Sequence, residues 1–495
     1  MSPISASAPF DSHFLIGKDY GMSTITIMDP VTRIEGHMKV EVTIDTLNGQ
    51  QQIVDARCTG TLFRGFETLL TGRSPLDAPV ITQRVCGVCP ISHGLTSVLA
   101  LENVSEWLPP TNARLLRNLT QGANFLQSHI LHFYLLAALD YVSGPNASPW
   151  KPAWSVDMRS GLDPVAANLG KALEARRRAH EMGAVFGGKM PGSHAYIPGG
   201  FTATATSGRI SQFKAHLIAL TDFIRNVYIP DVNKVATVYA DYFNLGAGCK
   251  NLLAFGVFQM DDFNQDKLLA PGYVKNAGTS VSKLDPNQIS ESVAYSWYAD
   301  RTDNLAPSAG ATEPLYPKGD AYSWLKAPRL SKDPYEAGPL ARMWINGDYR
   351  RGISIMDRHA ARAQEALKVA VAMQEWLNIL APGEMSYDKV FDQHSGVGIG
   401  MSEAPRGALG HWVKIVSGKI SQYQIITPTC WNASPRDGMN VPGPMEQALI
   451  GTPVKDPAQP IEALRVIHAF DPCLSCAVHV MRPEGKPTVV WDGKN

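Results

Sequence analysis

Two Cys-x-x-Cys pairs lie near opposite ends of this chain of 495 residues. Cys86 and Cys89 form the first pair in RVCGVCPISH, and Cys473 and Cys476 form the second pair in DPCLSCAVH. Four thiolates that a fold brings together make a tetrahedral site for a thiophilic transition metal. Such a site requires the two ends of the chain to meet, and its function depends on whether the metal is structural or redox-active.

A structural zinc site is the plainest alternative explanation of these pairs. Zinc modules usually space their pairs by about 15 to 20 residues, because the metal replaces the core that a small module lacks. Here most of the chain separates the pairs, and 44% of the residues are hydrophobic, which is ample for a core. The spacing favours a catalytic or cluster site, although by itself it leaves zinc and two unrelated pairs open.

Composition excludes some classes of partner. The chain has 45 Lys and Arg residues and 45 Asp and Glu residues, so no global field attracts nucleic acid or an anionic membrane. Outside the two pairs, we expect Cys58, Cys249 and Cys430 to be small buried residues. The odd total of 7 cysteines argues against a disulfide framework, and the three outside the pairs are too few and too scattered for an iron–sulfur cluster.

The N-terminal segment carries no recognisable targeting signal. Residues 1–22 lack the basic start and the sustained apolar run of a secretory or twin-arginine signal. No stretch of the chain approaches the ~18 uninterrupted apolar residues of a spanning helix. We therefore expect no membrane span in this chain, and export would need a partner that carries it.

Local patterns predict two β-hairpins. Residues 38–44 alternate between apolar and polar side chains, and the turn signal Asn48-Gly49 and the strand-like residues 53–58 follow. Residues 412–416 and 420–426 form a similar pair of strand-like runs near the other end of the chain. Each pair predicts two antiparallel strands that are joined by a tight turn.

Most of the sequence between these hairpins predicts helix. Residues 112–142 have a polar start, with Thr111 or Asn112 as the cap, and are then apolar almost all round, which is typical of a buried helix. Residues 357–380 predict a second long helix, and residues 264–335, rich in Pro, Gly, Asp and Ser, predict an irregular surface insertion. We therefore expect a mainly α fold with small β elements, an α+β class.

The residues around the cysteines carry a family resemblance. Arg-x-Cys-Gly-x-Cys-x-x-x-His (84–93) and Asp-Pro-Cys-x-x-Cys-x-x-His (471–479) resemble the two signatures of the large subunit of nickel–iron hydrogenases. Five further motifs of that family occur in the family's order along nearly the whole chain: TRIEGH (32–37), LFRGFE (62–67), SHILHFY (128–134), GPLARMW (338–344) and EAPRGALGHW (403–412). The resemblance implies the hydrogenase large-subunit fold.

The resemblance also implies what the cysteines bind. Cys89 and Cys476 would bridge nickel to an iron that carries carbon monoxide and cyanide, whereas Cys86 and Cys473 would bind nickel alone. Thiolates are soft donors suited to such metals, and zinc, which has no redox chemistry, leaves the flanking motifs unexplained. The closest-looking subgroup, the nickel–iron–selenium enzymes, has selenocysteine where this chain has Cys473.

The implied reaction is the reversible cleavage of dihydrogen into protons and electrons. By resemblance, the thiolate of Cys473 is the base and Glu35 carries the proton onward. A desolvated Glu has a raised pKa and can exchange protons with a thiol. Without the resemblance, Glu35 would be an ordinary residue at the edge of the first predicted hairpin.

Four more residues acquire roles next to the metals by resemblance. The guanidinium of Arg406 would lie over the open metal position, where a fixed cation can polarise substrate or bind a cyanide ligand. Pro405 and Thr429 would lie near the diatomic ligands, and His93 would donate a hydrogen bond to the bridging sulfur. The alternatives are a surface salt bridge for Arg406 and an ordinary core or surface position for His93.

A second metal site is implied near the C-terminus. Its ligands would be Glu67, the main-chain carbonyl of Ile425, and His479. Oxygen ligands suit magnesium, whereas a histidine also suits iron, so either ion fits. Two positions depart from the family, because Ser128 stands where most members have Asp and Gly192 stands where relatives often have His.

The resemblance divides the chain into three parts. Residues 1–22 would be an N-terminal extension, residues 23–479 the catalytic domain, and residues 480–495 an extension that a maturation protease removes. The alternative for residues 480–495 is a retained edge strand.

Partners and location follow from the same resemblance. A small subunit with iron–sulfur clusters would receive the electrons in a heterodimer, with an apolar contact face around the first cysteine pair. The complex would be periplasmic, or associated with the periplasmic side of the membrane, through export with that partner; a cytoplasmic location is the alternative. The other candidate function is a non-catalytic or hydrogen-sensing relative on the same scaffold, and the four cysteines argue against the quinone-complex type, which has lost them.

Overall fold

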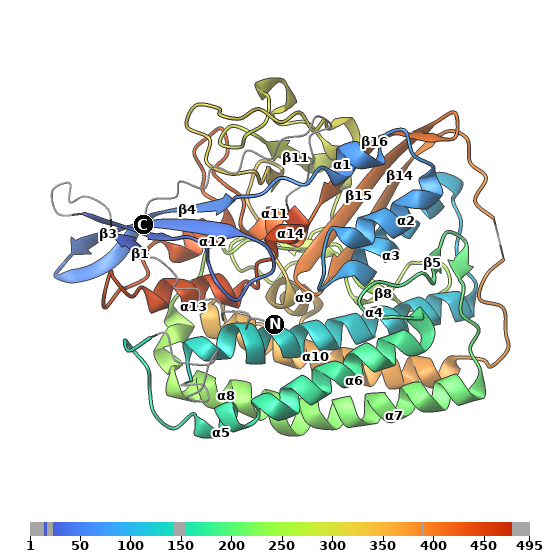
Figure 1. Ribbon diagram of the computed structural model, residues 1–495, viewed down its shortest axis with the longest axis horizontal. Helices are drawn as coiled ribbons and strands as arrows, with labels where there is room; N and C mark the ends of the chain where they lie inside the picture. Colours follow the sequence, from blue (N-terminus) through green and yellow to red (C-terminus); the bar gives the residue numbers. More distant parts are fainter. Residues whose placement is uncertain (1–13, 17–22, 143–153, 389, 478–495) are drawn as a thin grey trace, which may run out of the picture.

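The computed structural model describes residues 14–16, 23–142, 154–388 and 390–477, with the backbone alone at 14–16, 476 and 477. Long helices form one layer of the molecule, and small sheets with their short helices form the other (Figure 1). The expected α+β class, with long buried helices and hairpins near both ends of the chain, is confirmed. None of the described helices is both long and apolar enough to cross a membrane.

Five long helices form the helical layer: α4 (Thr111–Leu131), α6 (Leu169–Gly187), α7 (Ser207–Phe223), α8 (Ile229–Val238) and α10 (Ile355–Ile379). α4 contacts both α6 and α10, and nearly all of its side chains are buried. The predicted burial of this helix and the predicted helix at 357–380 are both confirmed.

The start and the end of α4 differ from the prediction. Its N-cap is Pro110, because the Thr111 hydroxyl donates instead to Asp262 Oδ2 at 2.7 Å and Asn112 bonds the segment after α10. Thr111 or Asn112 as the cap was therefore wrong. Beyond Leu131 the helix widens into a π-helix, His132–Ala137, and then tightens into a 3₁₀ turn, Ala138–Asp140. Such π-helical turns often mark functional sites.

The first predicted hairpin is part of a larger sheet. β3 (Met38–Leu47) and β4 (Gln50–Gly60) pair antiparallel, and Asn48 and Gly49 both adopt positive φ at the turn between them, as a primed turn requires. β1 (Phe14–Ile16) and β2 (Thr24–Met28), which the sequence patterns did not reveal, extend the order to β1-β2-β3-β4.

The second predicted hairpin gains a third strand. β15 (Gly407–Val416) and β16 (Lys419–Ile426) pair as expected, with β14 (Gly396–Ala404) on the other side of β15. Helix α3 (Pro90–Ser105) lies directly on β14. β14 escaped prediction because its GVGIG start is rich in glycine, which weakens any strand signal.

Glycine makes the contact between α3 and β14 possible. A Cβ atom on Gly398 would lie 2.0 Å from the carbonyl oxygen of Ala100, and one on Gly400 would lie 2.1 Å from that of Thr96. Because residues two apart face the same side of a strand, these glycines let the backbone of α3 approach the sheet. The start of α3 carries the first cysteine pair, so this packing positions the site.

The expectation of an irregular surface insertion at 264–335 was half wrong. The segment is irregular, but β11 (Ile289–Ser292) pairs with β12 (Ala327–Leu330), and much of the segment packs inward. Even Lys326 is 7% exposed, because it lies between buried polar partners.

The remaining elements are short. They are α1 (Phe66–Leu70), α2 (Ala78–Ile81), α5 (Asp163–Ala167), β5 (Tyr196–Ile197), β6 (Gly200–Phe201), β7 (Leu252–Ala254), β8 (Val257–Gln259), β9 (Lys267–Leu269), β10 (Gly272–Val274), β13 (Glu336–Ala337), α9 (Pro339–Asn346), α11 (Pro428–Asn432), α12 (Pro444–Leu449), α13 (Ile461–Ala469) and α14 (Leu474–Ala477).

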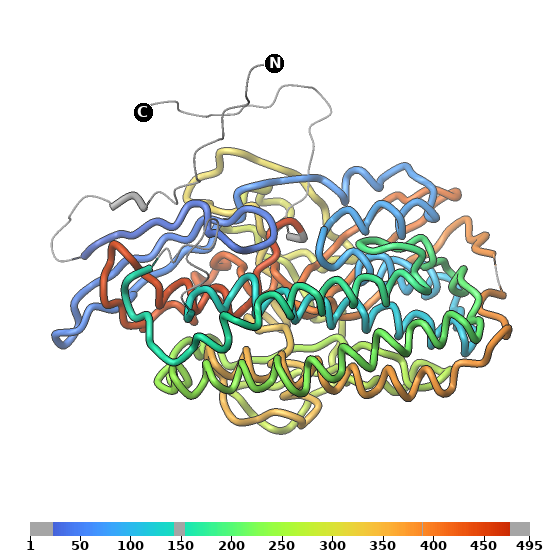
Figure 2. The backbone as a smooth tube through the Cα atoms, turned by 60° about the horizontal axis from the view of Figure 1, so that its bottom comes forward, coloured from blue at the N-terminus to red at the C-terminus, as the bar shows by residue number. Residues whose placement is uncertain are grey.

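The two ends of the described chain lie side by side. Figures 1 and 2 show the red C-terminal helices against the blue N-terminal sheet. α12 contacts β4, and the amide of Ile53 donates to the carbonyl of Thr452 at 3.0 Å. A second, smaller apolar core joins α1, α3, β15 and β16 with the C-terminal segment, and it contains Cys86, Cys89 and Cys473.

Three histidines are buried between α4, its π-helical continuation and α10. The rings of His132 and His359 stack with centroids 5.5 Å apart, while His129 bonds Glu365 at 2.9 Å. Burial, aided by Arg362, lowers the pKa of His359 to about 3. This ring is therefore neutral in the folded protein at neutral pH.

We expect Gly398→Ala to lower the thermal unfolding temperature. The new methyl group would overlap the backbone of α3, and overpacking of this kind typically costs about 1–3 kcal/mol. Gly170→Ala, in α6 with no atom within 4 Å of the new Cβ, is the matched control and should leave that temperature unchanged or raise it. Equal effects of the two substitutions would contradict the packing role of Gly398.

We expect stability to fall as the pH drops below 6.5, partly through His359. The unfolded chain takes up a proton on this ring near pH 6.5, whereas the folded protein resists it down to about pH 3. Each pH unit in that window costs up to ~1.4 kcal/mol for one such group. Unfolding temperatures measured from pH 7 to 4 should therefore fall less steeply in His359→Gln than in the parent. His394→Gln, at an exposed histidine, is the control, and its unfolding temperature should change with pH as that of the parent does. If the unfolding temperatures of the parent and both variants fell in parallel, the contribution assigned to His359 would be contradicted.

Candidate metal centre

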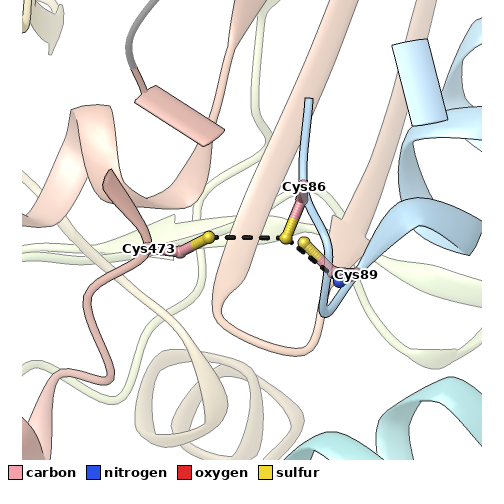
Figure 3. Close-up of side chains that lie close together, drawn as sticks. All are labelled: Cys86, Cys89 and Cys473. Atoms are coloured by element: carbon pink, nitrogen blue, oxygen red, sulfur yellow. Dashed lines mark hydrogen bonds between the residues drawn. The ribbon is translucent and has the colours of Figure 1, made fainter. Parts of the chain in front are cut away.

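Three of the four predicted cysteine ligands lie together. The sulfur atoms of Cys86 and Cys473 are 3.4 Å apart, and those of Cys86, Cys89 and Cys473 all lie within 4.8 Å of one another (Figure 3). Sulfurs that share one ion at ~2.3 Å in tetrahedral geometry are ~3.8 Å apart. All three residues are buried. The donor set therefore fits a single thiophilic metal.

The first pair is held by its own backbone. The Sγ of Cys86 accepts hydrogen bonds from the amides of Cys89, at 3.1 Å, and Val88, at 3.3 Å. Cys89 is the N-cap of α3, and Pro90 begins the helix. Amide donors and the positive end of a helix both favour the thiolate over the thiol, which is the form that binds a metal.

The second pair is held against the N-terminal segment. Glu35 and Cys473 form a parallel bridge, in which the Leu474 amide donates to the Glu35 carbonyl at 2.7 Å. The Thr429 hydroxyl accepts a hydrogen bond from the Cys473 amide at 2.9 Å. Cys476 lies in α14, and its side chain is outside the part of the chain that the structure describes.

Arg406 lies at the turn between β14 and β15 and is 1% exposed. Its Nε forms an ion pair with Asp471 Oδ1 at 3.0 Å, but the geometry is not that of a hydrogen bond, and Nε, Nη1 and Nη2 have no hydrogen-bond partner among the described residues. Burial opposes its charge, yet Asp471 and then Cys473 outweigh burial and raise the pKa of Arg406 well above its usual value. A permanent cation with unused donors thus lies beside the sulfurs, as a bound anionic ligand would require. The alternative of a surface salt bridge is wrong.

Ser128 is buried, and its hydroxyl has no hydrogen-bond partner among the described residues. A serine carries no charge, so this position provides no counter-charge for Arg406. Asp471 supplies that charge. We had not assigned Asp471 a role, although it belongs to the second cysteine signature. Gly192, the other departure, has φ +81, and a Cβ there would meet only the Gln83 side chain at 3.4 Å.

Glu35 lies beside the first cysteine pair and not at the edge of a hairpin. One carboxylate oxygen accepts a hydrogen bond from the Gly87 amide at 3.4 Å. Burial, and then the charge of Cys86, raise the pKa of Glu35, while Arg406 opposes them. A carboxyl group that is partly desolvated and in contact with both cysteine segments is placed to exchange a proton with a thiol.

His93 ends a buried chain of hydrogen bonds. Its Nδ1 is 3.2 Å from Nε2 of His411, whose Nδ1 is 2.9 Å from the Tyr423 hydroxyl, and that hydroxyl is 2.9 Å from Oγ of Ser97. Burial lowers the pKa of His93 to about 4, so the ring is neutral. Its Nε2 has no partner among the described residues. The direction of donation along this chain fixes the tautomer of His93. With the Tyr423 hydroxyl donating to Ser97, His411 donates from Nδ1 to Tyr423 and His93 donates from Nδ1 to His411; a proton on Nε2 of His93 requires the reverse direction, with Ser97 donating to Tyr423.

The remaining predicted residue at this site, Pro405, is held by a second network. Arg342 on α9 donates to the Pro405 carbonyl at 2.8 Å, to Glu365 at 2.6 Å and to Glu403 at 2.7 Å. All of these side chains are buried. We had assigned no role to Arg342 or Glu403, although both belong to quoted motifs, because a motif alone does not reveal which residues contact each other.

Comparison with known proteins agrees with this geometry. A family model described as nickel-dependent hydrogenase matches residues 64–168, 151–352 and 348–479. The chain belongs to the nickel-dependent hydrogenase family. A second model, described as HoxL-like, matches residues 24–59.

Relatives of this hydrogenase chain match it along nearly its whole length. The periplasmic NiFeSe hydrogenase large subunit of Desulfomicrobium baculatum is 41% identical over 501 residues, 92% of this chain and 95% of that protein. The uptake hydrogenase large subunit of Rhizobium leguminosarum bv. viciae is 34% identical over 578 residues, 93% and 96% of the two chains.

Solved structures agree as well. The Ni-Fe-Se hydrogenase from D. vulgaris Hildenborough in the reduced state matches with a TM-score of 0.89 at 41% identity, over 92% of this chain and 100% of that chain. The expected hydrogenase large-subunit fold is confirmed.

The predicted second metal site of this hydrogenase is described in part. Glu67 on α1 accepts hydrogen bonds from the Ile425 amide, at 2.9 Å, and from the Thr312 hydroxyl. Burial opposes the charge of Lys326 nearby, but Glu291 and then Glu67 outweigh burial and raise the pKa of Lys326. Glu67 and Ile425 thus lie together as predicted, whereas His479 is outside the described residues.

The segment before the first cysteine pair exposes large apolar side chains. Leu62, Leu69, Leu76 and Val80 have exposed fractions of 46%, 46%, 48% and 41%. These residues lie in and around α1 and α2, which lead to Cys86. Large exposed apolar side chains in one region are typical of a surface that another protein covers.

We expect Tyr423→Phe to destabilise the hydrogenase by about 1–3 kcal/mol, the usual cost of leaving buried polar partners unsatisfied. The change removes the hydroxyl between His411 and Ser97. Tyr335→Phe is the matched control, because the Tyr335 hydroxyl is buried without a hydrogen-bond partner in the described part of the chain. Denaturant unfolding should separate the two variants, and equal stability would refute the structural role of the chain of hydrogen bonds.

Proposed function

We propose that this chain is the catalytic subunit of a hydrogenase that interconverts dihydrogen with protons and electrons. Its centre would be nickel and an iron with carbon monoxide and cyanide ligands, held by Cys86, Cys89, Cys473 and Cys476. The observation that carries the proposal is the meeting of three buried sulfurs from both ends of the chain within 4.8 Å. Relatives named as nickel–iron–selenium hydrogenases support the choice of metals.

When bound, such a centre supplies the redox chemistry that dihydrogen cleavage needs. The protein supplies the base and the path for the proton. The Cys473 thiolate would take up the proton released when the H–H bond breaks, forming an S–H bond. That S–H bond then breaks as the proton passes to the carboxylate of Glu35 and forms an O–H bond there, while the electron pair of the H–H bond goes to the centre. The raised pKa of Glu35 brings the proton affinities of the two groups closer together, so this transfer costs little.

Arg406 would provide a fixed positive charge beside the centre. Its unused donor nitrogens would bind a cyanide ligand or polarise the substrate, and Asp471 holds the guanidinium in place. Because the group is buried, its electrostatic effect is stronger than it would be in water.

Three further residues would contact the ligands of the centre. His93 would donate from Nε2 to the sulfur of Cys89, in the tautomer in which Ser97 donates to Tyr423 and His411 donates from Nε2 to Nδ1 of His93. Pro405 and Thr429 would lie near the diatomic ligands. The contact between the Thr429 hydroxyl and the Cys473 amide supports this location.

We also propose a magnesium or iron ion at the second site. Its ligands would be Glu67, the carbonyl of Ile425, and His479. The contact between Glu67 and the Ile425 amide supports the pairing of the first two.

The electrons would pass to a small subunit with iron–sulfur clusters, in a heterodimer. The apolar surface around Leu62, Leu69, Leu76 and Val80 would be part of the contact. We propose a periplasmic location through export with that subunit, as one relative is named periplasmic. Residues 23–479 would form the catalytic domain after residues 1–22, and a maturation protease would remove residues 480–495.

A hydrogen-sensing role on the same scaffold is the second candidate. It shares the metal centre, so it differs in turnover and not in geometry. Steady hydrogen oxidation with an artificial electron acceptor favours the enzyme, whereas metal-loaded protein with negligible turnover would favour the sensor.

The metal centre predicts a definite composition. Purified heterodimer should contain nickel and iron, with nickel at one equivalent, and should show infrared bands of metal-bound carbon monoxide and cyanide. Cys86→Ser should lose nickel, because an alcohol is a poor ligand for a soft metal. Cys58→Ser, at a buried cysteine outside the cluster, should keep it. Zinc in place of nickel, with no bands in mature protein, would refute the proposal.

Glu35→Gln should stop the exchange of hydrogen isotopes with solvent while leaving nickel, iron and the infrared bands in place. An amide cannot accept and release the proton at this position, whereas the hydrogen bond with Gly87 survives. Glu41→Gln, on β3, is the control and should exchange normally. Isotope exchange can be followed by mass spectrometry of the gas phase, and near-normal exchange in Glu35→Gln would exclude its relay role.

A further inference from the structure

A cluster of charged residues joins three segments near the proposed proton path. Arg33 contacts Asp140 Oδ1 through Nη2, and Asp140 Oδ2 lies 2.6 Å from Nδ1 of His468. Asp140 is 0% and His468 1% exposed at the side chain. We call Arg33, Asp140 and His468 the clamp. Its members come from the TRIEGH segment, the 3₁₀ turn after α4, and α13.

His468 closes the clamp onto the backbone next to Glu35. Its Nε2 lies 2.9 Å from the carbonyl oxygen of Thr32, while its Nδ1 faces the Asp140 carboxylate. A carbonyl oxygen and an ionised carboxylate both accept hydrogen bonds, so each ring nitrogen of His468 faces an acceptor. The ring thus has a fixed partner on either side. The main-chain carbonyl of His468 accepts a hydrogen bond from Nε2 of His132 at 2.6 Å, and this contact fixes the position of His468.

The ionised state of Asp140 follows from its neighbours. Burial alone would raise the pKa of Asp140, but Arg33 and His468 outweigh it and hold the pKa well below its usual range. Arg465 donates to the Asp140 backbone carbonyl at 3.0 and 2.7 Å and so anchors the 3₁₀ turn.

Arg33 is held in a conformation that it would not adopt alone. Its φ is +56°, in the left-handed region, which is sterically unfavourable for a residue that has a side chain. Nη1 donates to the Leu136 carbonyl at 2.6 Å, at the end of the π-helical segment. The last carbonyls of a helix have no partner within it. The irregular end of α4 therefore provides the acceptors that fix Arg33.

The segment that carries Glu35 is held mainly at its two ends. None of the residues 32–37 is fully buried, and Ile34 is the residue of this stretch that packs, partly buried, against the hydrophobic core. The clamp holds its beginning, at Thr32 and Arg33. The hydrogen bond from the Leu474 amide to the Glu35 carbonyl holds its end. Gly36 at φ +83 also packs so tightly that a Cβ would lie 2.3 Å from the Ser475 amide nitrogen.

We infer that Asp140 and His468 are positioning residues for proton transfer: through Thr32 and Arg33 they hold the Glu35 carboxyl at a fixed distance from the Cys473 sulfur. The inference rests on the proposed relay role of Glu35. His468 lies on the chain that leads to Cys473, so one residue ties the two groups of the relay to each other. Buried ion pairs contribute little net stability, so a role in orientation accounts better for the burial of these polar groups here.

The test uses the intact heterodimer with Asp140→Asn, which keeps the shape but removes the charge. Amide deuterium uptake in peptides that span residues 32–36 should become about tenfold faster, as expected for the loss of charge-assisted hydrogen bonds. Isotope exchange between hydrogen and solvent should fall about tenfold to a hundredfold, because small displacements weaken proton transfer steeply. The solvent isotope effect on hydrogen oxidation should increase, while nickel, iron and the infrared bands stay unchanged.

Asp437→Asn is the matched control. Asp437 is also buried and pairs with an arginine, Arg329, at 2.8 Å, but it is not among the contacts of the Glu35 segment. It should leave both the uptake at 32–36 and the isotope exchange as in the parent. Equal effects of the two Asp→Asn changes would overturn the inference, as would unchanged uptake and exchange in Asp140→Asn.

Two further variants give the same test by other routes. His468→Gln retains the Arg33–Asp140 pair and should show the same faster deuterium uptake at residues 32–36 and the same loss of isotope exchange as Asp140→Asn. If neither Asp140→Asn nor His468→Gln assembles into the heterodimer, the same two measurements are made on Arg33→Lys. The relay itself is tested separately by Glu35→Gln. If Glu35→Gln exchanges normally, the relay fails, whereas a blocked Glu35→Gln beside a normal Asp140→Asn refutes the positioning role alone.

Discussion

The whole structure depends on thiolates from both ends of one chain meeting at a single point. The sulfurs of Cys86 and Cys473 are 3.4 Å apart although 387 positions separate them in the sequence. Reaching this geometry requires the C-terminal helices to pack on the N-terminal sheet and requires α3 and β14 to pack without side chains between them. The layer of long helices packs against both of these regions, so much of the fold is needed to position a few sulfur atoms.

Concentrating thiolates in a core has an electrostatic cost that the neighbouring residues reduce. Backbone amides donate to the Cys86 sulfur, and Arg406 places a permanent positive charge beside the cluster. Asp471 balances that charge, and Arg342 balances Glu365 and Glu403 one layer further out. Each ion is thus paired, as burial in a low dielectric demands. The guanidinium nitrogens of Arg406 that lack hydrogen-bond partners among the described residues mark the place where a bound ligand would accept hydrogen bonds.

The sequence predicted what depends on local pattern and on the family motifs. Both hairpins, the two long helices and the meeting of Cys86, Cys89 and Cys473 could be predicted. The N-cap of α4 and the inward packing of residues 264–335 could not, because tertiary partners decided them. Likewise Asp471, His411 and the contact of Asp140 with Arg33 were missed: motifs identify which residues matter but do not say which of them touch.

The absence of side chains on Gly398 and Gly400 has a consequence for how this enzyme could evolve. Cys89 is the N-cap of α3, and β14 leads into the turn with Arg406, so one interface determines the spacing between the sulfur of Cys89 and the guanidinium of Arg406. A single methyl group there would wedge the helix off the strand and widen that spacing. Substitutions in the interface between α3 and β14, well away from the metal, would therefore alter the reactivity of the metal although they change none of the residues that contact it.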